Sequence, residues 1–315
     1  MMNEHEPNNS FVDTLLNLVG GSGNASLRIK VALVGVPALL LILFLTPTWV
    51  FGIFLGIVAA IAAVEFVLTT RTAGHIRVIA YVAASAFLIP LSFSLPFISL
   101  GWVFVALLLL LALFVEAMLA YDTDRAVPFS FVCINFFVGA IIPLLLGTLA
   151  ILRDIPEGMP RTIELGNITW FFDGRAYVLI PFVIAFVSDA GGYFVGNAFG
   201  KHKLLVKVSP KKTIEGSLGA FAATIVAMLL FCLIMILAFD AEFSFLAVVI
   251  YSIFGSAITQ IGDLAFSMIK REYGKKDFGN LLPGHGGVMD RFDSMVLLAP
   301  FITALVFWFP VFWFG

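Results

Sequence analysis

Residues 221–239 read FAATIVAMLLFCLIMILAF and residues 103–115 read VFVALLLLLALFV, and neither run carries a charged side chain. Both are apolar around the whole circumference of a helix, whereas a helix of a soluble protein keeps a polar face. In lipid, backbone N–H and C=O groups must be bonded within the segment, so these runs predict membrane-spanning helices. The alternating ten-residue strands of a membrane β-barrel do not occur in the sequence.

The rest of the chain repeats this pattern. Of its 315 residues, 61% are hydrophobic and only 12% are charged, which is the composition of a membrane protein. We therefore predict an all-α polytopic membrane protein with about nine transmembrane helices, with boundaries good to about three residues. The expected spans are 31–45, 49–69, 78–93, 98–119, 129–152, 177–199, 217–239, 245–270 and 294–314.

The distribution of Lys and Arg predicts how these helices are oriented. If successive loops lie on alternate sides of the membrane, 15 of the 18 basic residues fall on one side. The other three, Arg153, Arg161 and Arg175, share a single loop. Because cytoplasmic loops are enriched in Lys and Arg, the N-terminus is expected in the cytoplasm and the C-terminus outside.

Residues 1–27 form a polar tail without Lys or Arg. The tail lacks the basic start and the cleavage site of a signal peptide, so the first span is expected to insert uncleaved. Residues 28–315 are interpreted as one membrane domain, with N-terminal helices at 28–175 and a catalytic half at 176–315. Both cysteines lie in apolar runs, which argues against a disulfide framework or a zinc site.

The residues that suggest chemistry concentrate in segment 267–293, SMIKREYGKKDFGNLLPGHGGVMDRFD. So many charges in so apolar a chain are costly unless they have a function. Just before this segment, Asp263 shares a helix face with Ser267 and Lys270, about 10 Å from Lys270 along the axis. A carboxylate at that depth needs a cation or water, and the plainer alternative is a helix-packing Asp paired with a neighbouring Lys.

Asp290 and Asp293 are three residues apart at the expected start of the last span, again on one helix face. Asp293 or Ser294 could cap that helix. Capping alone does not explain two acids together with Asp263 on the preceding helix. Three carboxylates without Cys or clustered His suit a hard cation, so we predict a Mg²⁺ site at Asp263, Asp290 and Asp293.

Two further stretches offer groups that could bind phosphate. In the turn after Pro283, the amides of Gly286 and Gly287 could approach a phosphate and His285 could donate to it, although a lone His in a loop is more often structural. The glycines of the sixth span have a plainer explanation, which is close packing between helices. Polar groups of this span and the next loop could bind a polyphosphate or, less specifically, anionic lipid: Asp189, Asn197, Ser209, Lys211, Lys212 and Thr213.

Several familiar catalytic motifs are missing from the sequence. It contains no G-x-x-x-x-G-K-[ST] loop, no dinucleotide fingerprint, no G-x-S-x-G elbow and no H-E-x-x-H helix. Hydrolase and ATPase chemistry are therefore disfavoured. Glu65 and Glu116 lie near the expected cytoplasmic ends of their spans, where partial hydration lowers the cost of a charge, and they are given no role.

The C-terminal half resembles a known family. The pattern S-M-I-K-R, four residues, K-D-F-G and then L-P-G-H-G-G-V-M-D-R-F-D, between Ser267 and Asp293, is similar to the signature of CTP:phosphatidate cytidylyltransferases, or CDP-diacylglycerol synthases. The resemblance extends to SDAGGYFVGNAFGKHK at 188–203 and SPKKTIEG at 209–216, and so covers the chain from about residue 177. The first five spans resemble the family only in being hydrophobic helices.

The resemblance implies an enzyme that joins CTP and phosphatidate to give CDP-diacylglycerol and pyrophosphate, with Mg²⁺ and a second cation of open identity. It gives catalytic roles to Asp263, Lys270, Asp290 and Asp293, with Asp263 and Asp293 the first choices as metal ligands and Asp290 next. Phosphate oxygens would be held by Lys270, Arg271, Lys211 and Lys212. The remaining expected substrate-binding residues are Asp189, Asn197, Ser209, Thr213, Ser267, Lys276, His285, Gly286, Gly287 and Arg291.

The resemblance also predicts the membrane and the compartment in which the protein acts. The site would face the cytoplasm from a bacterial inner membrane, so that CTP enters from water and phosphatidate from the lipid. The glycine-rich helices would allow a homodimer, and no nucleic acid is expected as a partner.

Three alternatives remain at this stage. The acceptor could be another lipid phosphate, such as an isoprenoid-ether phosphatidate, or a polyprenol-type substrate. The chain could instead be a transporter with Asp189 and Asp263 on an ion path, but that predicts polar residues in both halves of the membrane and an inverted repeat. An inactive scaffold homologue is the third alternative, and the intact set of acids and bases argues against it.

Overall fold

The computed structural model describes residues 25–72, 76–95, 100–121, 126–155, 174–239, 241–281 and 286–314. Within these ranges the chain is almost entirely helical, with two small two-stranded sheets. Eight helices of the described residues are long and apolar enough to cross a membrane. The predicted class, an all-α polytopic membrane protein, is confirmed.

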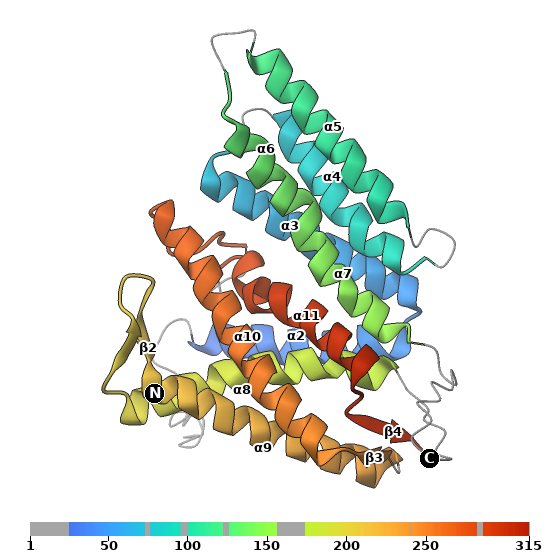
Figure 1. Cartoon of the computed structure of the whole chain (residues 1–315), viewed down its shortest axis with the longest axis vertical. Helices are drawn as coiled ribbons and strands as arrows, with labels where there is room; N and C mark the ends of the chain where they lie inside the picture. Colours follow the sequence, from blue (N-terminus) through green and yellow to red (C-terminus); the bar gives the residue numbers. More distant parts are fainter. Residues whose placement is uncertain are drawn as a thin grey trace, which may run out of the picture.

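The N-terminal helices occupy the upper part of Figure 1, except for α2, which lies lower, behind α10 and α11. Their bounds are α2 Ala25–Leu45, α3 Thr48–Thr70, α4 Ile76–Phe93 and α5 Gly101–Tyr121. The next span is continuous from Phe129 to Arg153 and consists of α6 Phe129–Phe136, a π-helical turn η2 Phe137–Ile141 and α7 Ile142–Arg153. The α5 helix has only two buried residues, Leu109 and Leu113, and Glu116 is its single charged residue, as expected of a helix that faces lipid.

The C-terminal helices are α8 Gly174–Phe199, α9 Ile214–Phe239, α10 Phe245–Glu272 and α11 Met289–Trp308. Two antiparallel pairs join or flank them, β1 Lys203–Leu205 with β2 Ser209–Thr213 and β3 Ala241–Phe243 with β4 Phe312–Phe314. Helices α8 and α9 run side by side, and α10 crosses them on its way to α11 (Figure 1). Because α11 packs on α7 and α3 as well as on α8 and α10, it connects the two halves.

The two ends of the predicted topology differ from the structure. The first predicted span forms helix α2, but α2 is not among the eight candidate spans of the described residues. The last span was predicted at 294–314, whereas α11 begins at Met289 and ends at Trp308. Pro310 explains the early end, because proline disfavours helical backbone at the preceding residue, and Phe309 has φ −147° and ψ 76°. The tail prediction lies largely outside the described residues.

Glycines bring α8 and α9 into close contact. A Cβ atom added to Gly216 would lie 2.7 Å from the carbonyl oxygen of Gly192 and 3.1 Å from the Cα of Gly196. The packing explanation for the glycines of the sixth span is therefore confirmed. The same contact places the start of α9, and the strand before it, against α8.

A buried arginine holds the end of α2 in place. Arg153, only 5% exposed, donates from Nε to the carbonyl of Leu43 at 3.0 Å and from Nη2 to the carbonyl of Thr46. Its guanidinium also lies over the Phe51 ring, 5.3 Å from the centroid. Carbonyls at a helix C-terminus lack intrahelical donors and favour a cation, so this interaction fixes α2 against α3 and α7.

Replacing Arg153 by Leu should therefore lower the free energy of unfolding by about 2 kcal/mol, the loss expected for buried hydrogen bonds to a charged donor. Arg77→Leu is the matched control, because Arg77 is exposed and its ion pair among the described residues is with Glu116, so the change in stability should be less than about 1 kcal/mol. Thermal unfolding in detergent measures both, and equal stability of the two variants would contradict the assignment.

Candidate active site

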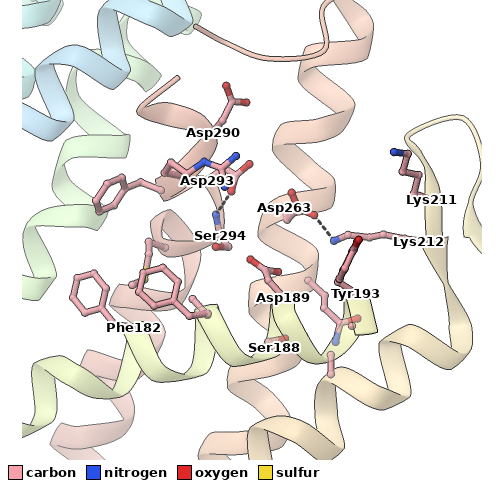
Figure 2. Close-up of a pocket in the computed structure, with 18 of the residues that line it drawn as sticks. Phe182, Ser188, Asp189, Tyr193, Lys211, Lys212, Asp263, Asp290, Asp293 and Ser294 are labelled. Atoms are coloured by element: carbon pink, nitrogen blue, oxygen red, sulfur yellow. Dashed lines mark hydrogen bonds and ion pairs between the residues drawn. The ribbon is translucent and has the colours of Figure 1, made fainter. Parts of the chain in front are cut away.

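A cavity of about 990 Å³ lies where α2, α3, α8, α9, α10, α11 and strand β2 meet. Figure 2 shows its polar side, where Asp189, Asp263 and Asp293 point toward the same space from α8, α10 and α11. The other side is apolar. It is lined by Leu39, Ile42, Phe54, Val58, Phe182 and Phe186.

Asp263 is paired with a lysine from the hairpin. Its Oδ2 forms an ion pair with Nζ of Lys212 on β2, and both side chains are 28% exposed (Figure 2). The sequence placed Asp263, Ser267 and Lys270 on one face of the helix. Asp263 and Lys270 do line the cavity, whereas Ser267 does not.

Lys270 is the most deeply buried cation of the site. Its Nζ lies 2.7 Å from Oδ1 of Asp290 and 3.5 Å from Oδ2 of Asp293, and all three side chains are at most 8% exposed. The ammonium also lies 5.3 Å from the centroid of the Phe278 ring. We call Lys270, Asp290 and Asp293 the Lys270 cluster. Since a buried charge is tolerated only when paired, this cluster fixes the end of α10 to the start of α11.

Asp290 also orders the glycine-rich turn. Its Oδ2 accepts from the backbone N–H of Phe278 at 2.8 Å and from that of Gly287 at 3.0 Å, on the two sides of the turn. Gly286 has φ 83°, a conformation that residues with a side chain rarely adopt. Both oxygens of Asp290 are thus engaged, one with Lys270 and one with two amides.

The hairpin β1–β2 sets the position of Lys211 and Lys212. Glu215 accepts from the backbone N–H groups of Lys201 at 3.0 Å and His202 at 3.2 Å. Thr213 Oγ1 accepts from the Gly216 N–H at 3.1 Å, so Thr213 caps the N-terminus of α9. These bonds fix the open end of the hairpin, where Lys203 pairs with Thr213. Strands this short were not predicted from the sequence.

The structure brings together most of the predicted site residues. The cavity is lined by Asp189, Asn197, Lys211, Lys212, Thr213, Asp263, Lys270, Asp290, Arg291 and Asp293. Six others do not line it: Ser209, Ser267, Arg271, Lys276, Gly286 and Gly287. Arg271 instead donates to the carbonyls of Val208 and Lys275, which holds the hairpin against α10. His285 lies outside the described residues. The substrate-binding roles of these residues stay predictions.

A polar network deeper in the cavity was missed. Ser188 and Ser256 hydroxyls lie 2.8 Å apart, Gln260 Nε2 donates to Ser256 Oγ at 3.2 Å, and Ser217 donates to Gln260 Oε1 at 2.5 Å. The signal was present in the sequence, because Ser256 and Gln260 are four residues apart in an apolar span and precede Asp263. Glu65, given no role on sequence grounds, is also buried, next to the start of α11.

The positions of the carboxylates can be compared with the arrangement that a bound cation requires. In the described part of the chain, no three His, Cys, Asp or Glu residues are arranged to hold a metal ion as they stand. Asp263 and Asp293 face the cavity, and Asp189 interacts electrostatically with both. Hard oxygen donors of this kind fit Mg²⁺. Asp290 fits less well, because both its oxygens are already bonded.

The fold and site define an integral membrane protein with one cavity whose charged side adjoins an apolar side. The profile of the cytidylyltransferase family matches residues 26–309, and the chain belongs to that family. The resemblance stated from the sequence is therefore confirmed.

Part of the chain is also similar to individual curated proteins of this family. A protein of Bacillus subtilis (strain 168) named phosphatidate cytidylyltransferase is 40% identical over 144 residues, which are 46% of this chain and 51% of that protein. A protein of the same name from Staphylococcus haemolyticus (strain JCSC1435) is 39% identical over 134 residues, 42% of this chain and 50% of that protein. The chain thus spans about half the length of the curated relatives it matches.

Removing the cation of the Lys270 cluster should destabilise the fold. Lys270→Met leaves two buried carboxylates without their partner, and such a change costs about 3–5 kcal/mol of unfolding free energy. The double variant Lys270→Met/Asp290→Leu should lose less than the sum of the single variants, because the pair is removed together. Lys275→Met, at an exposed position, is the control and should stay within about 0.5 kcal/mol. Additive losses in denaturant unfolding would contradict the cluster.

Proposed function

We propose that the protein transfers a cytidylyl group from CTP to phosphatidate, which gives CDP-diacylglycerol and pyrophosphate. The observation that carries this proposal is the cavity itself, whose charged side and apolar side adjoin. An enzyme that joins a water-soluble nucleotide to a lipid phosphate needs this combination. The names of the curated relatives support the same reaction.

The apolar side of the cavity suits the lipid chains. Helices α2, α3 and α8 supply its aromatic and aliphatic lining, and Arg153 holds the α2 end that contributes to it. A phosphatidate placed there would direct its phosphate toward Lys212, on the charged side of the cavity. The acyl chains could then stay in an apolar environment while the phosphate reacts.

The lipid phosphate needs little activation. A phosphate monoester loses its second proton at about pH 6, so at neutral pH it is already an ionised nucleophile. One of its oxygens would attack the α-phosphorus of CTP while the bond to the bridging oxygen breaks and pyrophosphate departs. No catalytic base is required, which agrees with the missing base motifs. Lys211, Lys212 and Arg291 line the cavity and would hold phosphate oxygens during the transfer.

The charge of the cavity lining is the reason why we propose a bound cation. Its lining carries five carboxylates, Asp189, Asp263, Asp277, Asp290 and Asp293, against four basic side chains, Lys211, Lys212, Lys270 and Arg291. Such a lining is not positive enough to accept a triphosphate and a lipid phosphate together. We therefore keep Mg²⁺ as the cofactor, with Asp263 and Asp293 as its ligands. When bound, it would neutralise the triphosphate and favour the departure of pyrophosphate.

The orientation is part of this proposal. The end of α10 and the β1–β2 hairpin lie on one side of the molecule, opposite β3–β4 (Figure 1). The positive-inside rule places the basic hairpin side in the cytoplasm, where CTP is found. We also propose a bacterial inner membrane as the location, because the named relatives are bacterial proteins. A homodimer stays a prediction, although the α8 glycines that suggested it pack against α9 within the chain.

Asp263→Asn should abolish formation of CDP-lipid while the protein stays folded in detergent. The reason is that the variant keeps the shape of the side chain but loses the charge that pairs with Lys212 and would hold the cation. Labelled CTP offered with phosphatidate, an ether-linked phosphatidate and a polyprenyl phosphate measures turnover and acceptor choice together. Asp154→Asn, near the far end of α7, is the matched control and should remain active. Full activity of Asp263→Asn would refute the assignment.

Mg²⁺ should also stabilise the protein measurably. At a concentration about 100 times its dissociation constant, a ligand of the folded state adds about 2.7 kcal/mol to the unfolding free energy. We expect Mg²⁺ to raise the unfolding temperature of the parent, and a chelator to reverse the shift and stop turnover. Asp293→Asn should lose most of the shift. An equal shift in that variant would exclude Asp293 as a ligand.

A further inference from the structure

We propose that Glu65 and Thr69 of α3, outside the catalytic half, are positioning residues of the active site. They hold the chain on both sides of the glycine-rich turn, residues 277–281 and 286–289, which we call the turn flanks. Through the turn flanks they keep Asp290, and therefore Lys270, in place. This inference rests on the proposed cytidylyl transfer.

Glu65 caps a helix to which it is not connected in sequence. Its side chain is buried, and Oε2 accepts from the backbone N–H of Met289, the first residue of α11, at 2.9 Å. Val288, the residue at the capping position of α11, makes no side-chain capping bond. A helix N-terminus has unpaired N–H groups and favours a negative charge. The Glu65 carboxylate therefore caps the N-terminus of α11 in place of a residue next to that helix in the sequence.

The turn flanks leave room for this carboxylate only because two of their residues are glycine. A Cβ atom on Gly279 would collide with Oε1 and Cδ of Glu65, and one on Gly287 would collide with Oε2. The Glu65 carboxylate therefore lies between the two flanks. It contacts both at once, so it can fix their separation.

Thr69 and Phe66 add a second contact on the same face of α3. Thr69 Oγ1 donates to the carbonyl of Phe278 at 2.8 Å. The Phe66 ring stacks on the Phe278 ring, with centroids 5.0 Å apart and planes inclined by 16°. Spacings of three and four residues place Glu65, Phe66 and Thr69 along one side of the helix.

These contacts lead directly to the Lys270 cluster. The N–H of Phe278 donates to Asp290, and its ring lies beside the ammonium of Lys270. Asp290 in turn binds Lys270 at 2.7 Å. A change at Glu65 or Thr69 therefore reaches a cavity-lining lysine through the turn flanks, without a contact of its own to the cavity.

The first test is limited trypsin digestion of the folded, full-length protein in detergent. Lys275 and Lys276 are exposed and adjoin the first turn flank, so cleavage there reports its opening. Glu65→Leu should accelerate this cleavage about tenfold, the change expected when one charge-assisted hydrogen bond is lost. Glu65→Gln keeps an acceptor oxygen and should stay within about threefold of the parent. Thr69→Val should accelerate cleavage by a smaller factor. It provides the test if Glu65→Leu fails to fold.

Two matched controls separate positioning from general destabilisation. Thr70→Val alters the neighbouring threonine, whose hydroxyl donates within its own helix to Phe66 and Val67. Glu116→Leu alters a glutamate that pairs only with the exposed Arg77 among the described residues. Neither control should change cleavage at Lys275 and Lys276. Cleavage of Glu65→Leu at the parental rate, or equal acceleration in the controls, would overturn the proposal.

Turnover of the same variants gives the second readout. Glu65→Leu should lower kcat about tenfold or more while Glu65→Gln recovers most of it, and Thr70→Val should match the parent. Loss of kcat in Glu65→Gln equal to that in Glu65→Leu, with parental cleavage in both, would also overturn the positioning role. If the parent shows no CTP turnover while the cleavage pattern is as expected, the proposed function fails and the contact of α3 with the turn flanks stands.

Discussion

The buried ammonium of Lys270 is the interaction on which the rest of the site depends. A cation held away from water in an apolar protein is stable only with anionic partners in good geometry. Asp290 and Asp293 supply them from the first turns of the next helix. The requirement fixes the end of α10 against the start of α11, and with it the turn between them. The residues that face the cavity take their positions from this arrangement.

The surroundings of the Lys270 cluster come from segments far apart in the sequence. Glu65 reaches the start of α11 from α3, and the β1–β2 hairpin brings Lys212 to Asp263. Close glycine packing of α8 on α9 keeps that hairpin beside Asp189. The cavity is thus bounded by both halves of the chain, although its charged residues come from the second half.

The sequence predicts features that depend on residues close together in the chain, and it does not predict contacts between distant residues. Long apolar runs determine helices locally, so the spans from α3 to α10 agree closely with expectation. The start of α11 was placed five residues too late, because its cap comes from Glu65, 224 positions away. The family resemblance implied that Asp189, Asp263, Lys212 and Asp293 belong to one site, and the cavity brings them together. The sequence suggested that a lysine could pair with Asp263, but the spacing of Asp263 and Lys270 on one face does not reveal which lysine meets which acid.

Asp290 and Asp293 show why helical spacing alone cannot assign roles. They are one turn apart and share Lys270, yet their other contacts differ. Asp290 binds two amides of the turn flanks, whereas Asp293 accepts one backbone N–H within the described residues, that of the adjacent Ser294. Asp293 also lies closer to Asp263 and Asp189 (Figure 2). One acid therefore organises the backbone while the other keeps a carboxylate directed at the cavity. A substitution of Asp290 should disturb the turn before it disturbs any bound cation, and a substitution of Asp293 should do the reverse.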